Sequence, residues 1–349
     1  MVKKKIICVS SLIIIGFTLI VFVPIQLISF KFFSYGMIDE SISYIYEPSS
    51  PSPIEKLYIN VDEGDVQIKY INPPVDYYAL IDVNIVMNGV KLAGKSYEDY
   101  LNISWNKSSS PANFTIEIIS DDWFNPSLWL FKEVNIVVTL RKDMVFDIIT
   151  NLTEGNFEIA VPWAVSIGNL ITNVSNGDIS YDFEHSTIQG NITCNINEGD
   201  LIFKSCDVEY AHNNSWDINV GKGNVNLEIY QYREMDANIT GKVKVNDGEV
   251  FIIYKDNTAN IGAILEIPYG DSFMSRGGLP GCIKNIYNFT CTEVNGFDYN
   301  HIDSESVMGT VYFTSFDLLS NIVKNYYSMR FEIIQGSFDM SLSSDPLFK

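Results

Sequence analysis

Residues 151–161 read NLTEGNFEIAV, and four segments of the same form follow: NVSNGDISYDF (173–183), NINEGDLIFKS (195–205), NVGKGNVNLEI (219–229) and KVNDGEVFIIY (244–254). Their glycines, Gly155, Gly177, Gly199, Gly223 and Gly248, are 22, 22, 24 and 25 residues apart. A repeat of this length cannot bury its own apolar face, so we expect its copies to stack on one another.

Apolar and polar residues alternate around each of these glycines. The positions three before, two after and four after the glycine are apolar in every copy, and the position directly after it is polar. This alternation predicts a strand, a tight turn and a second strand, with one face buried. Two outlying segments, around Gly64 and Gly336, follow the same rule. The residues two positions after the glycine should form an inward-facing ladder: Phe157, Ile179, Leu201, Val225 and Val250.

Three architectures fit this pattern. In a hairpin, the two strands of one copy would face each other across the turn. In a solenoid, the glycine would turn a corner and equivalent residues would stack between coils. An ordinary β-sandwich with recurrent turns is the third possibility. Periodicity alone does not separate them.

The segments resemble the family of putative adhesins, surface domains with a recurring apolar-x-x-NGD-apolar-x-apolar motif. The resemblance extends over about residues 130–260. It implies a β-helix-like fold, with relatives among cell-envelope stress proteins, and it implies no ligand, cofactor or catalytic residue. We therefore expect an all-β chain: one N-terminal transmembrane helix, then a β-solenoid or β-helix-like repeat domain with a flanking antiparallel sheet.

Composition divides the chain into six expected parts. They are a short cytoplasmic tail (1–5), a transmembrane anchor (6–30), a Pro/Ser linker (31–53), an antiparallel β cap domain (54–145), the glycine-punctuated repeat body (146–268), and a loop insert with a C-terminal β cap (269–349). Caps at both ends would cover strand edges that otherwise invite aggregation.

The anchor is predicted from residues 6–30, which carry no charge and are long enough to cross a bilayer about 30 Å thick. Lys3, Lys4 and Lys5 precede this segment and only Lys31 follows it at once. The positive-inside rule then places residues 32–349 outside the cell, on a single-pass membrane protein. A long cleavable signal peptide is the alternative, although the segment exceeds the usual apolar core and lacks an obvious cleavage site.

Nine Asn-x-Ser/Thr sequons support an extracellular location and are candidate glycosylation sites. They are Asn102, Asn106, Asn113, Asn151, Asn173, Asn191, Asn213, Asn238 and Asn288. The even set of cysteines on the same side, Cys194, Cys206, Cys282 and Cys291, suggests disulfides. Proximity favours Cys194–Cys206 and Cys282–Cys291, and buried free thiols are the alternative. We expect no metal site in these cysteines, because no CxxC pair or spaced histidine accompanies them.

Catalytic patterns are weak in this sequence. The formal net charge of −20, with no basic patch, excludes a nucleic-acid binder. Asp178 and Asp200, one repeat apart, form the best carboxylate pair, but an Asp after a turn glycine usually serves the turn. The repeat lacks the GGxGxD motif of calcium-binding coils. His185, His212 and His301 are scattered and read as ordinary loop residues.

The sequence therefore favours a non-catalytic, membrane-anchored adhesin-like or structural protein of the cell surface. Outward positions three residues after the glycines, such as Glu158, Ser180 and Asn226, offer a regular face for a surface glycan or a protein partner. A cell-envelope sensor or accessory protein that acts through membrane partners is the alternative. A polysaccharide-active β-helix enzyme is the third reading.

Overall fold

A computed structural model describes residues 35–48, 52–90, 92–107, 111–256, 261–269, 283–287, 289–294, 309–315 and 325–344. This part of the chain is all-β, and its two helical segments, η1 (Tyr97–Asp99) and η2 (Asp121–Phe124), are single 3-10 turns. None of its helices has the length and apolar character needed to cross a membrane. The predicted anchor at 6–30 lies outside the described residues.

The chain forms two compact units. One unit contains Asn84–Leu101, Ile118–Val134 and the described residues up to Ser41. The other contains Ile42–Val83, Asn102–Glu117 and the chain from Asn135 onward, and so holds every repeat glycine from Gly64 to Gly336.

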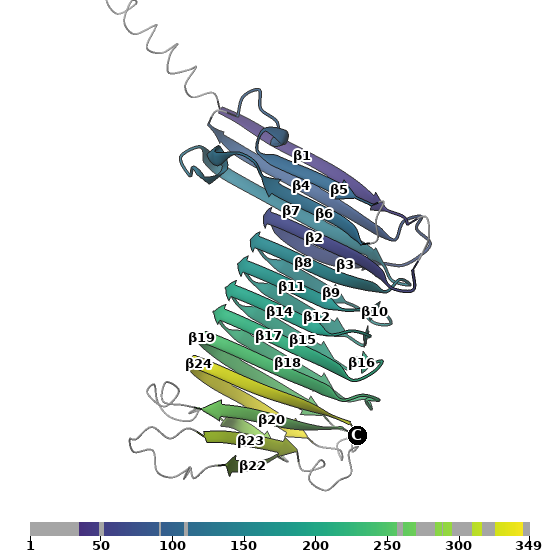
Figure 1. Cartoon of the computed structure of the whole chain (residues 1–349), viewed down its shortest axis with the longest axis vertical. Coiled ribbons are helices and arrows are strands. Elements are labelled where there is room, and N and C mark those ends of the chain that lie inside the picture. The colour runs from purple at the N-terminus through teal and green to yellow at the C-terminus, as the bar shows by residue number, and fades with distance from the viewer. Residues whose placement is uncertain are drawn as a thin grey trace, which may run out of the picture. The chain divides into compact units, whose positions relative to one another are not determined.

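The repeats form coils, each with one strand on either side of its glycine (Figure 1). The strands before a glycine are β2 (Glu55–Glu63), β8 (Phe146–Glu154), β11 (Leu170–Asn176), β14 (Ile192–Glu198) and β17 (Asn214–Lys222). The strands after a glycine are β3 (Asp65–Ile71), β9 (Phe157–Val161), β12 (Ile179–Glu184), β15 (Leu201–Cys206) and β18 (Val225–Gln231). In the last two coils, β19 (Ile239–Asp256) and β24 (Asn325–Ser344) run through the glycine.

Parallel pairing between neighbouring coils decides between the hairpin and the coil. Val174 on β11 lies opposite Leu152 on one side and Ile196 on the other, so equivalent residues 22 apart are register partners. The strands after the glycines pair in the same way, as Ile179 does with Phe157 and Leu201. Three short strands form a separate parallel sheet: β10 (Ser166–Ile167), β13 (Thr187–Ile188) and β16 (Glu209–Tyr210).

Two coils join the stack from distant parts of the sequence. The Gly64 coil stacks directly on the Gly155 coil, because β2 pairs with β8 and β3 with β9. At the other end, β24 continues the stack beyond β19, and Gly336 lies opposite Gly248. The long segments between these coils are therefore insertions into one continuous stack.

The expectation of an antiparallel sheet in residues 54–145 is wrong for four of its strands. β2 pairs in parallel with β6 (Ala112–Ile118), and β3 pairs in parallel with β7 (Trp129–Arg141). Alternation marks the buried face of a strand but not its direction, so the sequence pattern could not distinguish the two pairings. Other strands here are β1 (Tyr35–Tyr46), β4 (Ala79–Val90) and β5 (Leu101–Asn106), with β1 and β7 both paired to β4.

Antiparallel pairs do occur beyond β19, from the end of the predicted repeat body onward. β20 (Ile261–Tyr269) pairs in parallel with the start of β24 and antiparallel with β23 (Gly309–Ser315). β22 (Phe289–Val294) pairs antiparallel with β23, while β21 (Ile283–Tyr287) pairs in parallel with the end of β24.

The turn glycines combine positive φ with close stacking of the backbone. Gly177 has φ 144°, and a Cβ atom there would lie 1.9 Å from the carbonyl oxygen of Gly155. Gly199 repeats this geometry against Gly177, with φ 142° and 2.0 Å. Any side chain would therefore strain the backbone and also force the coils apart.

The core lies between the strands of the coil, as the alternation predicts. All five residues two positions after the glycines are at most 1% exposed, which confirms the inward-facing ladder. Large aromatic side chains in this core contact one another from coil to coil. Tyr181 packs edge-on against Phe157 and Phe203, and Phe203 packs on Trp216 with ring centroids 4.6 Å apart.

The smaller unit has an aromatic core of its own. Trp123 is 1% exposed and lies beside Trp129, which packs edge-on against Tyr100. The ammonium group of Lys132 lies 4.2 Å from the centre of the Trp123 ring.

Candidate functional site

The described part of the coil stack carries a groove on each side of the glycine turns. The pre-glycine groove, of about 380 Å³, is lined by Asn173, Val174, Ser175, Asn195, Ile196, Asn197, Asn219, Val220, Gly221, Lys244 and Asn246. The post-glycine groove, of about 430 Å³, is lined by Asn156, Phe157, Glu158, Asp178, Ile179, Ser180, Asp200, Leu201, Ile202, Asn224, Val225, Asn226, Glu249 and Phe251. Because each groove takes side chains from successive coils, its residues recur with the period of the repeat.

A ladder of asparagine side chains runs across β6 and the strands before the glycines, and three of its members line the pre-glycine groove. The Nδ2 atom of each asparagine donates to the Oδ1 atom of the preceding one, at 2.7 to 3.1 Å, always in the same direction. The members are Asn113, Asn60, Asn151, Asn173, Asn195 and Asn219. Sequence reasoning missed this ladder, although five of its members stand four residues before a turn glycine.

Seven predicted glycosylation asparagines take part in side-chain hydrogen bonds. Asn113, Asn151 and Asn173 belong to the asparagine ladder. Asn191, Asn213 and Asn238 each accept a backbone N–H from the next coil through Oδ1. Asn102 donates to Glu117, Asn106 ends β5, and Asn288 lies outside the described residues. Glycosylation of these sites stays a prediction.

The polar residue directly after each glycine from Gly64 to Gly223 accepts a backbone N–H from the turn of the next coil. The backbone N–H of Asp200 donates to the Asp178 carboxylate at 2.8 Å, and that of Asn224 donates to Asp200 at 2.7 Å. Asn156 occupies the equivalent position one coil earlier and accepts the N–H of Asp178 in the same way. The best carboxylate pair of the sequence is thus engaged in structural hydrogen bonds.

The post-glycine groove presents one outward side chain per coil. Along five consecutive coils these are Glu158, Ser180, Ile202, Asn226 and Phe251. Ile202 and Phe251 are 41% and 36% exposed. The Oδ1 atom of Asn226 is buried and accepts no hydrogen bond, while its Nδ2 atom donates to Glu228. The groove thus combines hydrogen-bonding groups with exposed apolar surface.

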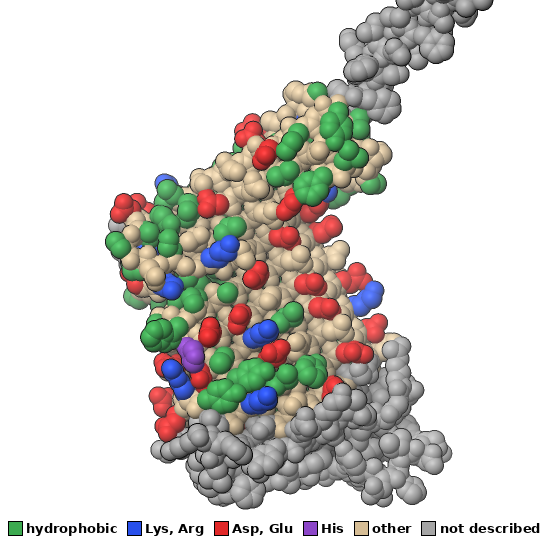
Figure 2. Space-filling model, turned by 180° about the vertical axis from the view of Figure 1, so that it is seen from behind, with side chains coloured by type: hydrophobic (Ala, Val, Ile, Leu, Met, Phe, Trp, Pro, Cys, Tyr) green, Lys and Arg blue, Asp and Glu red, His purple; other side chains and the backbone are tan. Residues whose placement is uncertain are grey.

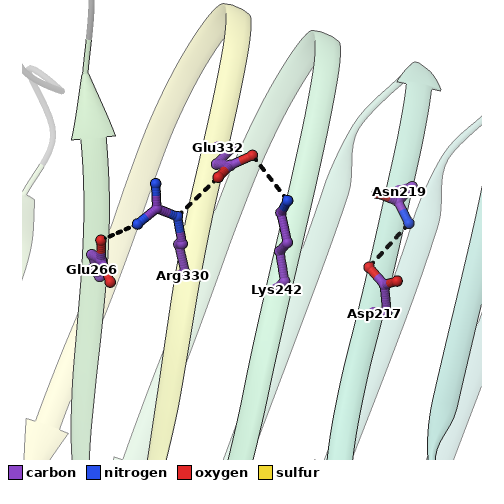
Figure 3. A network of polar contacts seen from close by, with 6 residues as sticks. All are labelled: Asp217, Asn219, Lys242, Glu266, Arg330 and Glu332. Atoms are coloured by element: carbon purple, nitrogen blue, oxygen red, sulfur yellow. Dashed lines mark hydrogen bonds and ion pairs between the residues drawn. The ribbon is translucent and has the colours of Figure 1, made fainter.

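Charged side chains form a chain of ion pairs at the end of the stack (Figure 3). Arg330 on β24 pairs with Glu266 on β20 and with Glu332, and Glu332 pairs with Lys242 on β19 at 3.3 Å. The hydrogen bond from Arg330, supported by Lys242, lowers the pKa of the Glu332 carboxyl below its usual value. Elsewhere, acidic side chains are spread over the face of the coils rather than gathered in one patch (Figure 2).

The predicted Cys194–Cys206 disulfide is wrong, because both thiols are free. Cys194 points into the core from β14, whereas Cys206 is the outward-alternating last residue of β15. Burial raises the pKa of the Cys194 thiol to about 12. Cys282 lies outside the described residues, and nothing is described of the Cys291 side chain on β22. His301 also lies outside them, while His185 lies beside Cys206 and Asp207.

No protein-family model matches the sequence, and no curated protein sequence does either. A "putative cell adhesion protein" from Clostridium sporogenes ATCC 15579 resembles the structure with a TM-score of 0.30 and 13% identity, over 88% of this chain and 99% of that one. A "putative lipid binding protein" from Parabacteroides distasonis ATCC 8503 resembles it with a TM-score of 0.22 and 11% identity, over 88% and 96%. Likeness at this level is too low to carry an argument about function.

Proposed function

We propose that this protein is a non-catalytic, adhesin-like protein of the cell surface, anchored by residues 6–30, whose coil stack binds an extended ligand in the post-glycine groove. The observation that carries the proposal is the groove itself. Its five outward side chains come from successive parallel strands, which lie about 4.8 Å apart, so they line a path of roughly 19 Å.

The side chains of the groove suit a surface glycan better than an apolar ligand. Glu158, Ser180 and Asn226 offer a carboxylate, a hydroxyl and an amide N–H, which can hydrogen-bond sugar hydroxyls. Ile202 and Phe251 offer apolar surface for the C–H faces of a sugar ring. Each coil would contribute weakly, and many copies on one cell would add their contributions.

The non-catalytic part of the proposal is supported by the role of Asp178 and Asp200. Each carboxylate accepts a backbone N–H from the next coil, as the asparagines at equivalent positions do. The double variant Asp178→Asn with Asp200→Asn keeps both acceptors and removes both charges. We expect it to fold, to bind like the wild type and to lose no activity. Loss of a polysaccharide-cleaving activity with the fold intact would favour the enzyme reading.

A glycan array probed with the full-length protein in lipid nanodiscs tests the binding. We expect retention of one class of extended glycan, and a loss of at least tenfold in apparent affinity for Ile202→Ser with Phe251→Ser. Ile334→Ser is the matched control, because Ile334 is 51% exposed and lies outside the groove. Equal weakening by the control, or no binding by the wild type to glycans or extended peptides, would count against the groove.

Protease added to intact cells tests the anchoring. The lysine asymmetry around residues 6–30 predicts that the repeat body is cleaved from outside while a short membrane fragment remains. Protection of the repeat body, or a mature chain that begins after Phe30, would contradict the anchored arrangement.

A further inference from the structure

Three potential metal ligands from two neighbouring coils meet where β12 and β15 end. His185 follows β12 directly, Cys206 is the last residue of β15, and Asp207 follows it. The backbone N–H of His185 donates to the carbonyl of Cys206 at 2.8 Å, which joins the two coils at this corner. His185 and Asp207 have φ of 46° and 49°, a left-handed conformation that His and Asp adopt more readily than most residues.

The ligand atoms of these residues face one another. One nitrogen of His185, the Sγ atom of Cys206 and a carboxylate oxygen of Asp207 all lie within 4.8 Å of one another. The Nδ1 atom of His185 is buried and accepts or donates no hydrogen bond. The Oδ2 atom of Asp207 lies 3.7 Å from it, which is too long for a hydrogen bond. A buried polar atom without a partner is costly, and a bound cation would satisfy it.

Asp207 is held in place by its other oxygen. Its Oδ1 atom accepts the backbone N–H groups of Tyr232 and Arg233 from the next coil, at 2.5 and 3.0 Å. The Asp207 side chain is only 9% exposed, and its Oδ2 atom is directed at His185. Such outer hydrogen bonds fix the orientation of a ligand before the metal binds.

The surroundings of the cluster favour a cation. Glu184 is the register partner of Cys206 across the β12–β15 pair. The carboxylates of Asp207, Glu184 and Asp182 act on the Cys206 thiol electrostatically, and Arg233 acts against them. The imidazole of His185 is 29% exposed, so an ion can reach the cluster from solvent.

We propose that His185, Cys206 and Asp207 form a binding site for Zn²⁺ or a similar borderline-soft divalent cation. A nitrogen, a thiolate and a carboxylate are together the ligand set that suits Zn²⁺, whereas Ca²⁺ and Mg²⁺ prefer oxygen alone. A tetrahedral site with ligand distances of about 2.0–2.3 Å brings the ligand atoms to about 3.5 Å from one another, a small contraction of the cluster. Water completes the fourth position.

The ion would clamp two coils together, because His185 belongs to one coil and the other two ligands to the next. Binding replaces the thiol proton of Cys206, which is released to solvent, by a bond from sulfur to the metal. Metal binding at this site can therefore be measured independently of any ligand binding in the post-glycine groove.

Titration of the chelator-treated, full-length protein in detergent with Co²⁺ and then Zn²⁺ tests the site. Co²⁺ should bind one ion per chain and give a thiolate-to-cobalt absorption band that Zn²⁺ abolishes. The band should be missing in Cys206→Ser. Zn²⁺ affinity, measured by competition with a fluorescent chelator, should fall at least tenfold in His185→Asn and in Asp207→Asn.

The variants are chosen to preserve the fold. Asn tolerates the left-handed backbone at both positions, and Asp207→Asn keeps the oxygen that accepts the Tyr232 and Arg233 amides. His212→Asn and Cys194→Ala are the matched controls and should leave binding unchanged. A cobalt band that persists in Cys206→Ser, no stoichiometric binding by the wild type, or equal weakening by the controls would overturn the proposal. If circular dichroism shows that Cys206→Ser does not fold, the Zn²⁺ affinity of Asp207→Asn decides whether the proposal holds.

Discussion

Replacing Gly199 by alanine tests the stacking of the turns most directly. A Cβ atom at this position would lie 2.0 Å from the carbonyl oxygen and 2.6 Å from the carbonyl carbon of Gly177. Since both contacts are with backbone, relief requires the two turns to separate by about an ångström or more, because ordinary carbon–oxygen contacts are longer than about 3 Å. The residue must also keep a φ of 142°, which L-amino acids rarely adopt.

The expected loss of stability follows from three contributions. Backbone strain costs about 1–3 kcal/mol. Separation of the turns weakens the bonds from Gly177 N to Glu198 O and from Asp200 N to Asp178, at about 0.5–1.5 kcal/mol each. The total of about 2–6 kcal/mol is a large part of the 5–15 kcal/mol typical of a domain.

Urea unfolding, followed by tryptophan fluorescence, measures this loss. Hydrogen exchange should localise it to the amides of β12, β14 and β15, because each coil contacts only its neighbours. Gly94→Ala is the control: Gly94 also has positive φ, 78°, but no atom lies within 4 Å of the added Cβ. It should cost only about 1–2 kcal/mol. A loss for Gly199→Ala no greater than for Gly94→Ala would refute the stacking argument.

Two further substitutions test the polar networks. Asn195→Asp removes the donor to Asn173 and places two oxygens where a hydrogen bond of 2.8 Å now lies. It should lower the free energy of unfolding, measured in urea, by about 1–3 kcal/mol. The control Asn197→Asp, at an exposed neighbouring residue, should cost little. Glu332→Gln should cost under about 1 kcal/mol at neutral pH, because its ion pairs are partly exposed. Since the pKa of Glu332 is lowered in the folded state, its contribution to stability is present above the usual pKa of 4.5 and is lost as the pH falls through the lowered pKa. The free energies of unfolding of the variant and the wild type should therefore become equal in acid. A difference that persists in acid would contradict the ion-pair account.

The repeat body was predictable because the residues that determine each strand and turn are close together in the sequence. The turn glycine and the alternating apolar residues lie within about ten residues of one another, and they give the strands, the turns and the buried ladder. The neighbours of the Gly64 coil were not predictable in this way. Its partner on β8 is 91 residues distant, and nothing in its alternation specifies whether a strand pairs in parallel.

The candidate sites were less predictable, although part of the signal is present. His185 and Asp207 are 22 residues apart, the spacing that makes residues of adjacent coils neighbours, and the ladder asparagines recur at the same period. Within a single coil, neither His185 nor the Cys206-Asp207 pair has a partner nearby in sequence that would mark a metal site. Only the stacking places them within reach of one another.

The shared register of the coils makes the length of the stack adjustable. Asn151, Asn173 and Asn195 make the same ladder contact, and Asn156, Asp178 and Asp200 the same turn contact, so each coil offers its neighbours an almost identical upper and lower surface. A gene that gained or lost one 22-residue unit would still encode a chain whose remaining coils fit. The reach of the groove could thus change in whole-coil steps, without redesign of the fold around it.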